Sequence, residues 1–373
     1  MRRLWHVLVP LSVFAALAIP ARAGGEVWIF DEFTVSEDAL CAMRDAMAER
    51  ALATHEPGTW APIEYSLSDG DLARMGLPSK DVLLSRRYPT PTLVTADGRA
   101  FDVPLAELEA ATQEAAAGPT VATYAGAGCL GIRPGAWLLL LSGGGIGWCS
   151  MAHVYGAPGS YDISTAGHCG RPGDTATVIA ALGNRSGVAG AVLLDFGTFA
   201  QVQDAGLGRD WAIIDIRPEY QGLVSPTMCF WGGPRGVYTK QGGVVEPSLT
   251  GNNPGVTINP DPLLAQAIVH YGHGAGVGAG GTPRAGTATY WGATHFMFEG
   301  AIAPGDSGSG ANTVLGDTVG ANMEAAGIIT HLYIDPLMRQ GVGIMGGTRT
   351  TAVPGTVANG QIVPYPAPAP GLP

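Results

Sequence analysis

The sequence predicts an all-β domain that begins near residue 124 and follows a smaller mixed α+β region. From residue 126 on, short apolar runs alternate with turns of glycine, proline and asparagine, and long helical periodicity is absent. The composition changes at the same place: residues 24–123 hold 17 acidic side chains, 7 basic side chains and 7 glycines, against 14, 10 and 49 in residues 124–373. The predicted strands include 137–141, 177–180, 191–194, 211–216, 267–269, 287–290 and 326–330.

Residues 1–23 have the pattern of a secretory signal peptide. Arg2 and Arg3 precede an apolar run over residues 4–19, and Ala21-Arg22-Ala23 offers small residues for cleavage. A membrane anchor is the alternative, but the run contains a histidine and a proline and is short for a span. We expect a secreted, extracellular protein with no membrane association after signal cleavage.

Residues 24–123 are predicted to mix helix and extended chain. Ser36 can cap a helix whose apolar stripe continues to residue 51. Residues 83–94 have the composition of extended chain and are followed by a turn at Asp97-Gly98. Pro104 fits the first position of a second helix over residues 105–116. The size and place of this region suit the pro-segment of a zymogen; a retained accessory domain is the alternative.

The charge of the chain excludes nucleic acid as an expected partner. The formal net charge is −11, Lys80 and Lys240 are its only lysines, and the arginines are scattered. Nucleic-acid phosphates require clustered lysine and arginine side chains.

Residues 353–373 are rich in proline, alanine and glycine, which predicts an extension without fixed structure. We expect a monomer.

Two short strings carry the chemistry. Ser164-Thr165-Ala166-Gly167-His168-Cys169 fixes a histidine, and Gly305-Asp306-Ser307-Gly308-Ser309-Gly310 fixes a serine in a glycine turn. A serine hydroxyl is a weak nucleophile unless an adjacent base takes its proton. The glycines allow the amides of Gly305 and Ser307 to turn inward and to donate to a developing oxyanion.

These strings resemble the signature pair of the chymotrypsin-like serine peptidases, and the resemblance covers roughly residues 126–350. The string Ile132-Arg133-Pro134-Gly135-Ala136 resembles the opening of the secreted actinobacterial branch. The resemblance implies two six-stranded Greek-key β-barrels over residues 124–352, with the catalytic groups in the cleft between them. It also implies a triad in the chain order histidine, aspartate, serine.

Asp210 is the candidate for the acid of this triad. It opens an apolar run that resembles the family's acid motif, and it lies between His168 and Ser307 in the chain, as the family order requires. Asp195, Asp204 and Asp215 are the alternatives. Asp195 is closer to the histidine in sequence and lacks the Trp-Ala-Ile-Ile run, and Asp215 is expected on the opposite face of the strand from Asp210.

Asp306 has a structural role in the family, where its buried carboxylate pairs with a cation that holds the oxyanion loop. Bacterial relatives supply that cation as an arginine two residues before a glycine. The string identified here as its match is His270-Tyr271-Gly272. We therefore expect His270 to be charged beside Asp306, because a carboxylate neighbour raises the pKa of a histidine. An ordinary turn histidine is the alternative.

The resemblance also places the primary specificity pocket at Ala301, Thr330, His331 and Leu332. An acid at position 301 selects arginine or lysine, so alanine there predicts another specificity. Leu332 replaces a glycine of the family and is expected to narrow the pocket, which favours small or medium apolar side chains. Selection of an acidic side chain by His331 is the alternative.

Five cysteines in a secreted chain suggest two disulfides and one remaining cysteine. The family bridges the pair that corresponds to Cys149 and Cys169, which pins the histidine loop. Cys129 and Cys229 are the expected second pair, and Cys41 remains.

The sequence therefore predicts a secreted serine endopeptidase that cleaves proteins or peptides through an acyl-enzyme, without cofactor or metal. A non-catalytic secreted binding module on the same fold is one alternative. A serine esterase is another, although the Gly-x-Ser-x-Gly elbow and βα alternation are absent from the sequence.

Overall fold

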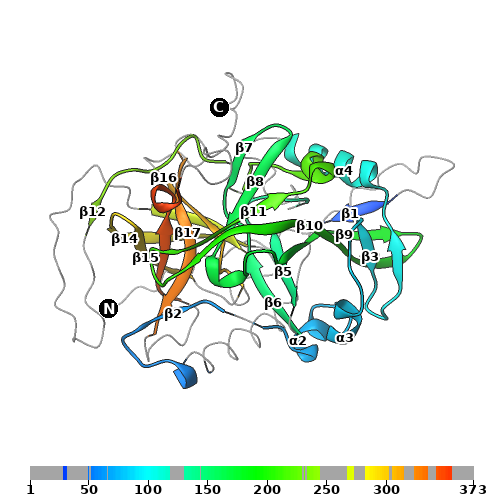
Figure 1. Cartoon of the computed structure of the whole chain (residues 1–373), viewed down its shortest axis with the longest axis horizontal. Helices are drawn as coiled ribbons and strands as arrows, with labels where there is room; N and C mark the ends of the chain where they lie inside the picture. Colours follow the sequence, from blue (N-terminus) through cyan, green and yellow to red (C-terminus); the bar gives the residue numbers. More distant parts are fainter. Residues whose placement is uncertain are drawn as a thin grey trace, which may run out of the picture.

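Two antiparallel β-sheets meet in the structure (Figure 1). The computed structural model describes residues 28–31, 49, 52–64, 66–117, 130–142, 144–228, 231, 233–243, 267–272, 282–301, 305–314, 323–334 and 342–354. The main path of the first sheet runs β6-β5-β9-β10-β11-β8-β7. Its strands are β5 (Trp137–Ser142), β6 (Gly145–Ser150), β7 (Val154–Ala157), β8 (Ser160–Thr165), β9 (Thr175–Arg185), β10 (Val188–Asp204) and β11 (Asp210–Ile216).

The second sheet closes into a barrel. Its order is β12-β14-β13-β16-β17-β18-β15, and the additional pairing of β14 with β15 joins six of these strands in a ring. The strands are β12 (Gly242–Gly243), β13 (Ala267–Gly272), β14 (Thr282–Trp291), β15 (His295–Ala301), β16 (Gly310–Val314), β17 (Met323–Tyr333) and β18 (Val342–Arg349). The predicted all-β fold is confirmed: one six-stranded barrel is closed, and the other sheet of antiparallel strands is consistent with the expected two-barrel arrangement. The seven predicted strand runs lie within β5, β9, β10, β11, β13, β14 and β17.

β5 is apolar along nearly its whole length because both of its faces are buried. Successive side chains of a strand point to opposite faces. Leu139 belongs to a core that it shares with Phe296 of the second sheet, whereas Leu138 belongs to a core that includes Ile213 of β11. A strand covered on both sides needs a continuous apolar run, and this explains the pattern seen in the sequence.

The N-terminal region combines helices with strands that extend both sheets. β1 (Ile29–Asp31) pairs with β9, β3 (Thr92–Val94) with β10 and with β4 (Ala100–Asp102), and β2 (Trp60–Pro62) with β17. Its helices include α2 (Asp69–Arg74), α3 (Lys80–Leu84) and α4 (Leu105–Ala117).

Several predictions for this region are tested by these elements. The helix expected after Pro104 is confirmed as α4, and the Asp97-Gly98 turn joins β3 to β4. The extended chain expected from residue 83 is wrong at its start, because residues 83 and 84 complete the helix that begins after Ser79. The signal segment, the predicted helix over residues 36–51, apart from its described residue 49, and the tail after residue 354 lie outside the described residues. Within the described chain, no helix is both long and apolar enough to cross a membrane.

Candidate active site

Three distant stretches of chain bring the predicted triad residues to the junction of the two sheets. His168 lies in the short 3-10 helix η1 (Gly167–Cys169), directly after β8. Asp210 is the first residue of β11, and Ser307 lies in the turn before β16. The first sheet therefore supplies the imidazole and the carboxylate, and the second supplies the hydroxyl.

These three side chains form one line of hydrogen bonds. His168 Nδ1 lies 2.6 Å from Asp210 Oδ2, and His168 Nε2 is hydrogen bonded to Ser307 Oγ. Because a carboxylate only accepts, Nδ1 is the donor toward Asp210, and Nε2 of the neutral ring accepts from the serine hydroxyl. The side chains of His168 and Asp210 are 2% and 0% exposed. The line is therefore shielded from water along its length.

Further contacts fix the carboxylate of Asp210. Oδ1 accepts from the amides of Gly167 and His168, the latter at 3.0 Å. The Asp210 amide donates to the Thr348 hydroxyl at 3.0 Å, and that hydroxyl donates back to the Asp210 carbonyl at 2.8 Å. Thr348 belongs to β18, so this pair of bonds ties the two sheets together beside the triad.

The three alternative acids form no hydrogen bond with the His168 ring. Asp195 is buried, but it accepts hydrogen bonds from the Tyr88 amide and the Thr177 hydroxyl. Asp204 and Asp215 are exposed on β10 and β11. Of the four candidates, Asp210 is the one hydrogen bonded to His168.

The turn that carries Ser307 depends on glycine. Gly308 has φ +86°, and a Cβ built there would overlap Thr165 Oγ1, so a larger residue fits neither the backbone nor the space. Ser150 anchors the turn: its hydroxyl donates to the Gly305 carbonyl at 2.7 Å and its amide donates to the Ser307 carbonyl at 2.7 Å.

The amides of Gly305 and Ser307 donate no hydrogen bond to another described residue, although both residues are buried. Buried backbone amides nearly always have a partner. Two donors without a described partner, next to a serine hydroxyl, are suited to bind an oxygen that carries negative charge.

The predicted pairing of His270 with Asp306 is wrong. The Arg284 guanidinium, from β14, forms the buried ion pair with Asp306 and also donates to the Gly272 carbonyl at 3.1 Å. His270 lies directly opposite Arg284 on the neighbouring strand β13. Burial lowers the pKa of His270 well below its usual value, and the nearby arginine lowers it further. His270 is therefore neutral, and neither ring nitrogen has a described hydrogen-bond partner.

Opposing effects set the pKa of His168. Burial disfavours its charged form, but the hydrogen bond and the charge of Asp210, with smaller contributions from Glu64 and Asp204, raise the pKa above its usual value. His331 lies 3.5 Å from Asp210 Oδ2 through its Nδ1, yet burial lowers its pKa to about 4. His331 is therefore neutral near pH 7 and brings no charge to the site.

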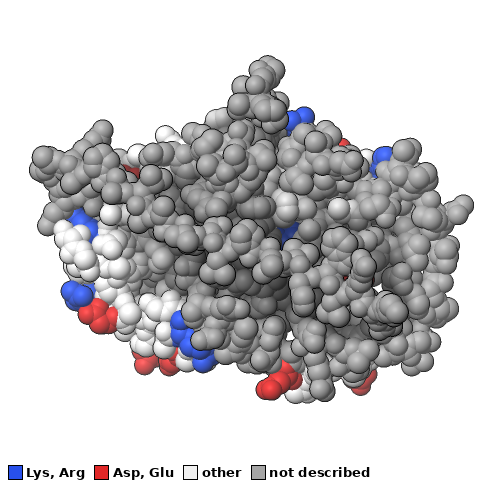
Figure 2. Space-filling view, turned by 180° about the vertical axis from the view of Figure 1, so that it is seen from behind, with Lys and Arg blue, Asp and Glu red and all other residues white. Residues whose placement is uncertain are grey.

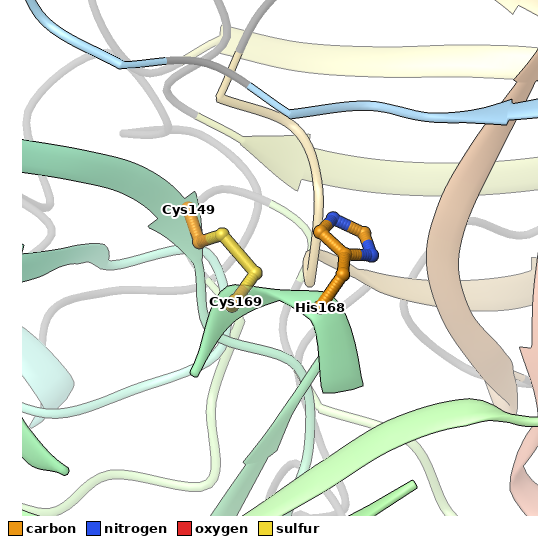
Figure 3. Close-up of side chains that lie close together, drawn as sticks. All are labelled: Cys149, His168 and Cys169. Atoms are coloured by element: carbon orange, nitrogen blue, oxygen red, sulfur yellow. A yellow bond between two sulfur atoms is a disulfide. The ribbon is translucent and has the colours of Figure 1, made fainter. Parts of the chain in front are cut away.

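The predicted disulfide between Cys149 and Cys169 is present and lies beside His168 (Figure 3). It joins β6 to η1. These three residues place possible metal-ligand atoms within 4.8 Å of one another, but both sulfurs are bonded to each other and His168 is engaged by Asp210 and Ser307. This cluster therefore offers no free thiolate to a metal. Cys41, Cys129 and Cys229 lie outside the described residues.

Three of the predicted pocket residues lie together on β17. Thr330, His331 and Leu332 are buried there, and the Thr330 hydroxyl is hydrogen bonded to His331 Nδ1 at 2.8 Å. His331 Nδ1 also lies beside Asp210 Oδ2. Ala301 is the last residue of β15, and its side chain is not among those described.

Charged side chains of both signs are interspersed on the part of the surface that Figure 2 colours. Blue and red residues lie next to one another along its lower edge.

No protein-family model and no curated protein matches the chain. Among solved structures, it is similar to Thermobifida fusca protease A, with a TM-score of 0.36 and 19% identity over 62% of this chain and 98% of that chain. It is also similar to a glutamic-acid-specific serine protease that uses a histidine triad in substrate binding. That match has a TM-score of 0.34 and 18% identity, and it covers 62% of this chain and 100% of that chain. The match to Nocardiopsis protease has a TM-score of 0.32 and 17% identity, and it covers 62% of this chain and 98% of that chain.

These similar structures are chymotrypsin-like serine proteases of actinobacteria, the family and branch that the sequence strings resemble. At these identities and TM-scores, the similarities carry no argument about the activity of this chain.

Sequence reasoning missed three groups around the site. Arg284 stands two residues before Gly286, the same spacing sought for the cation, so the signal was present a short way beyond the string that was chosen. Thr348 has no motif of its own. Glu64, whose charge acts on His168, belongs to an N-terminal segment far from the motifs.

Proposed function

We propose that the chain is a secreted serine endopeptidase in which Ser307 is the nucleophile, His168 the general base and acid, and Asp210 the group that orients the histidine. One observation carries the proposal: the continuous line of hydrogen bonds from Ser307 Oγ through His168 to Asp210. The tautomer that this line imposes leaves Nε2 free to accept the serine proton.

In the proposed reaction, Ser307 Oγ attacks a peptide carbonyl while His168 Nε2 takes the hydroxyl proton. The carbonyl oxygen becomes an oxyanion, which the amides of Gly305 and Ser307 are suited to bind. His168 then returns the proton to the leaving amine as the C–N bond breaks. Water, activated by the same imidazole, hydrolyses the ester and restores the hydroxyl.

The remaining assignments belong to the same proposal. Arg284 supports the loop through Asp306, and the pocket at Ala301, Thr330, His331 and Leu332 accepts small or medium apolar side chains rather than arginine or lysine. The signal segment directs secretion, and residues 24–123 form the pro-segment. Leu332 is apolar and buried on β17, and this supports the apolar preference.

Covalent labelling tests the nucleophile. Incubation of the full chain with a fluorophosphonate is expected to add one probe mass to Ser307, and His168→Ala should abolish the labelling. His55→Ala, at a half-buried histidine remote from the triad motifs, is the matched control and should label like the parent chain. If the His168→Ala variant were labelled as fully as the parent chain, the proposed role of His168 would be contradicted.

A library of peptides and a matched set of esters separates a peptidase from an esterase. We expect cleavage of peptides, with the new amino terminus identified by mass spectrometry. Hydrolysis of the esters alone favours an esterase, and labelling without any hydrolysis favours a binding module.

A further inference from the structure

One segment of the N-terminal region, described at residues 58–64, 66 and 67, contacts both sheets near the candidate active site; we call it the cleft segment. Its strand β2 pairs antiparallel with the end of β17, with Ala61 opposite Leu332. The Ile63 amide donates to the Thr330 carbonyl at 3.0 Å. Pro62 lies between Ala61 and Ile63 and faces His331. In the alternating pattern of an antiparallel pair this position needs no amide donor, so proline fits there.

The other end of the cleft segment joins the first sheet. Ser66 forms an antiparallel bridge with Gly147 of β6, and the Leu67 amide donates to the Ile146 carbonyl at 2.9 Å. The next residue of β6 is Trp148, whose ring lies directly against Gly305 of the serine turn. The segment therefore connects the edges of the two sheets that supply the triad, and in Figure 1 the blue chain after β2 continues toward α2 near β6.

The middle of the cleft segment lies close to the triad. Glu64 is one of the charges that raise the pKa of His168, which places its carboxylate within electrostatic reach of the imidazole. The residue before it, Ile63, is bonded to Thr330, the neighbour of His331, and His331 lies beside Asp210. Ile63 keeps its amide bond to β17, but its carbonyl accepts no hydrogen bond from Thr330. The chain thus leaves the sheet at the peptide bond between Ile63 and Glu64.

Burial along the cleft segment alternates. Ala61, Ile63 and Leu67 are 2%, 2% and 4% exposed, whereas Glu64 and Ser66 are exposed. One face of the segment is therefore apolar and covered by the protein. Main-chain pairing along a strand edge, with alternate side chains in apolar positions, is how many proteins hold an extended peptide.

We propose that the cleft segment occupies the substrate site of the chain's own catalytic centre, with Ile63 at the position of the residue before the bond to be cut. This inference rests on the proposed peptidase function. If the cleft segment occupies this site, the substrate site is blocked in the described form of the protein. The proposal also assigns the substrate class: extended peptides that pair with residues 330–333 and place a medium, branched apolar side chain where Ile63 lies.

A binding experiment tests the occlusion without requiring catalysis. The probe is the fluorescent decapeptide Gly-Thr-Trp-Ala-Pro-Ile-Glu-Tyr-Ser-Leu, added to full chains that all carry Ser307→Ala. An attached segment competes at an effective concentration on the order of millimolar, so the native segment should suppress binding of the probe by about tenfold or more. Ile63→Asp places a charge in a buried apolar position and should displace the segment, so that the probe binds.

Ser66→Asp is the matched control, because it adds the same charge to the same segment at an exposed side chain; it should bind the probe as weakly as the chain with the native segment. Ala61→Pro removes a main-chain donor facing Leu332 and is expected to act like Ile63→Asp. A cooperative thermal transition shows which variants are folded. A decapeptide with aspartate in place of isoleucine should not bind, which tests the substrate class.

Equal binding of the probe to the native and displaced chains would overturn the proposal, as would no binding to either folded displaced variant. Fluorophosphonate labelling of the same variants with Ser307 restored gives the independent outcome. Labelling of Ser307 should be at least about tenfold faster after displacement. Probe binding without labelling in any variant leaves the occlusion intact and contradicts the proposed catalytic function instead.

Discussion

The carboxylate of Asp306 is fully buried, so its charge must be neutralised inside the protein. Arg284 does this from the strand next to His270, at a register position directly opposite. A buried ion pair adds little net stability over apolar packing, but removal of one partner leaves the other charge uncompensated. Because Asp306 precedes Ser307, this pair controls the shape of the loop that holds the nucleophile.

We expect Arg284→Gln to destabilise the chain by about 3–5 kcal/mol and to abolish fluorophosphonate labelling of Ser307. Urea unfolding and intact-mass analysis measure the two effects. His270→Phe is the matched control. Residue 270 lies opposite Arg284 in register, its ring already lies against Phe298, and neither ring nitrogen has a described hydrogen-bond partner, so labelling should persist. Lost labelling in His270→Phe together with normal labelling in Arg284→Gln would reverse the assignment.

The charge of Glu64 provides a second prediction at the residue scale. This carboxylate helps to raise the pKa of His168, so Glu64→Gln should lower that pKa. An NMR titration of the His168 ring in the full chain should show its midpoint at lower pH than in the parent. Glu56→Gln, another exposed acid of the N-terminal region, is the control. An unchanged midpoint in Glu64→Gln would argue against contact between the cleft segment and the triad.

At the scale of elements, η1 is too short to fix His168 by its own hydrogen bonds, and its position depends on its neighbours. The disulfide from Cys169 to Cys149 attaches η1 to β6, and Asp210 binds the two amides at its start. The imidazole is therefore held from both sides of the helix.

Replacement of Cys149 and Cys169 by alanine should reduce the free energy of unfolding by about 3 kcal/mol, because the bridge joins residues at a sequence separation of 20. Labelling of Ser307 should slow as well, since η1 loses one of its anchors. Urea unfolding and the labelling rate test this. A double variant as stable as the parent, with an unchanged rate, would show that Asp210 alone positions the helix.

The sequence predicts elements well where local pattern and burial agree. The seven predicted strand runs are found because an apolar run bounded by turns is itself the consequence of burial. His168, Asp210 and Ser307 are found because their motifs are local. Arg284 is missed because His270 and Arg284 each stand two residues before a glycine, on the paired strands β13 and β14. Only the structure shows which of the two side chains reaches Asp306. The cleft segment is missed because pairing between β2 and β17, which lie near opposite ends of the chain, leaves no local pattern.

At the scale of the whole molecule, the N-terminal region is part of both sheets. β1 and β3 extend the first sheet and β2 pairs with the second. Leu72 and Leu83, from this region, share one apolar core with Trp137 of the first sheet and Phe296 of the second. The region therefore stabilises the arrangement of the sheets, and removing it would expose apolar surface on each of them.

Buried neutral histidines predict how this whole arrangement responds to acid. Burial lowers the pKa of His153 and His331 to about 4, and that of His270 well below its usual value of 6.5. In the unfolded chain these groups take up protons below about pH 6.5, whereas in the folded protein they do not. The stability they contribute is therefore present above pH 6.5 and is lost as the pH falls toward 4. His168, whose folded pKa is raised, acts in the opposite sense: its contribution is present below pH 6.5 and is lost as the pH rises through its folded pKa.

We expect the free energy of unfolding to fall between pH 6.5 and 4. His153, His270 and His331 should each contribute about 1.4 kcal/mol per pH unit to this fall. Urea unfolding at several pH values measures the slope. His153→Gln keeps a donor toward the Gly327 carbonyl but cannot titrate, so its slope should be shallower by about 1.4 kcal/mol per pH unit, while its stability at pH 8 reports the packing change alone. A slope identical to that of the parent chain would mean that His153 takes up its proton equally in the folded and unfolded states.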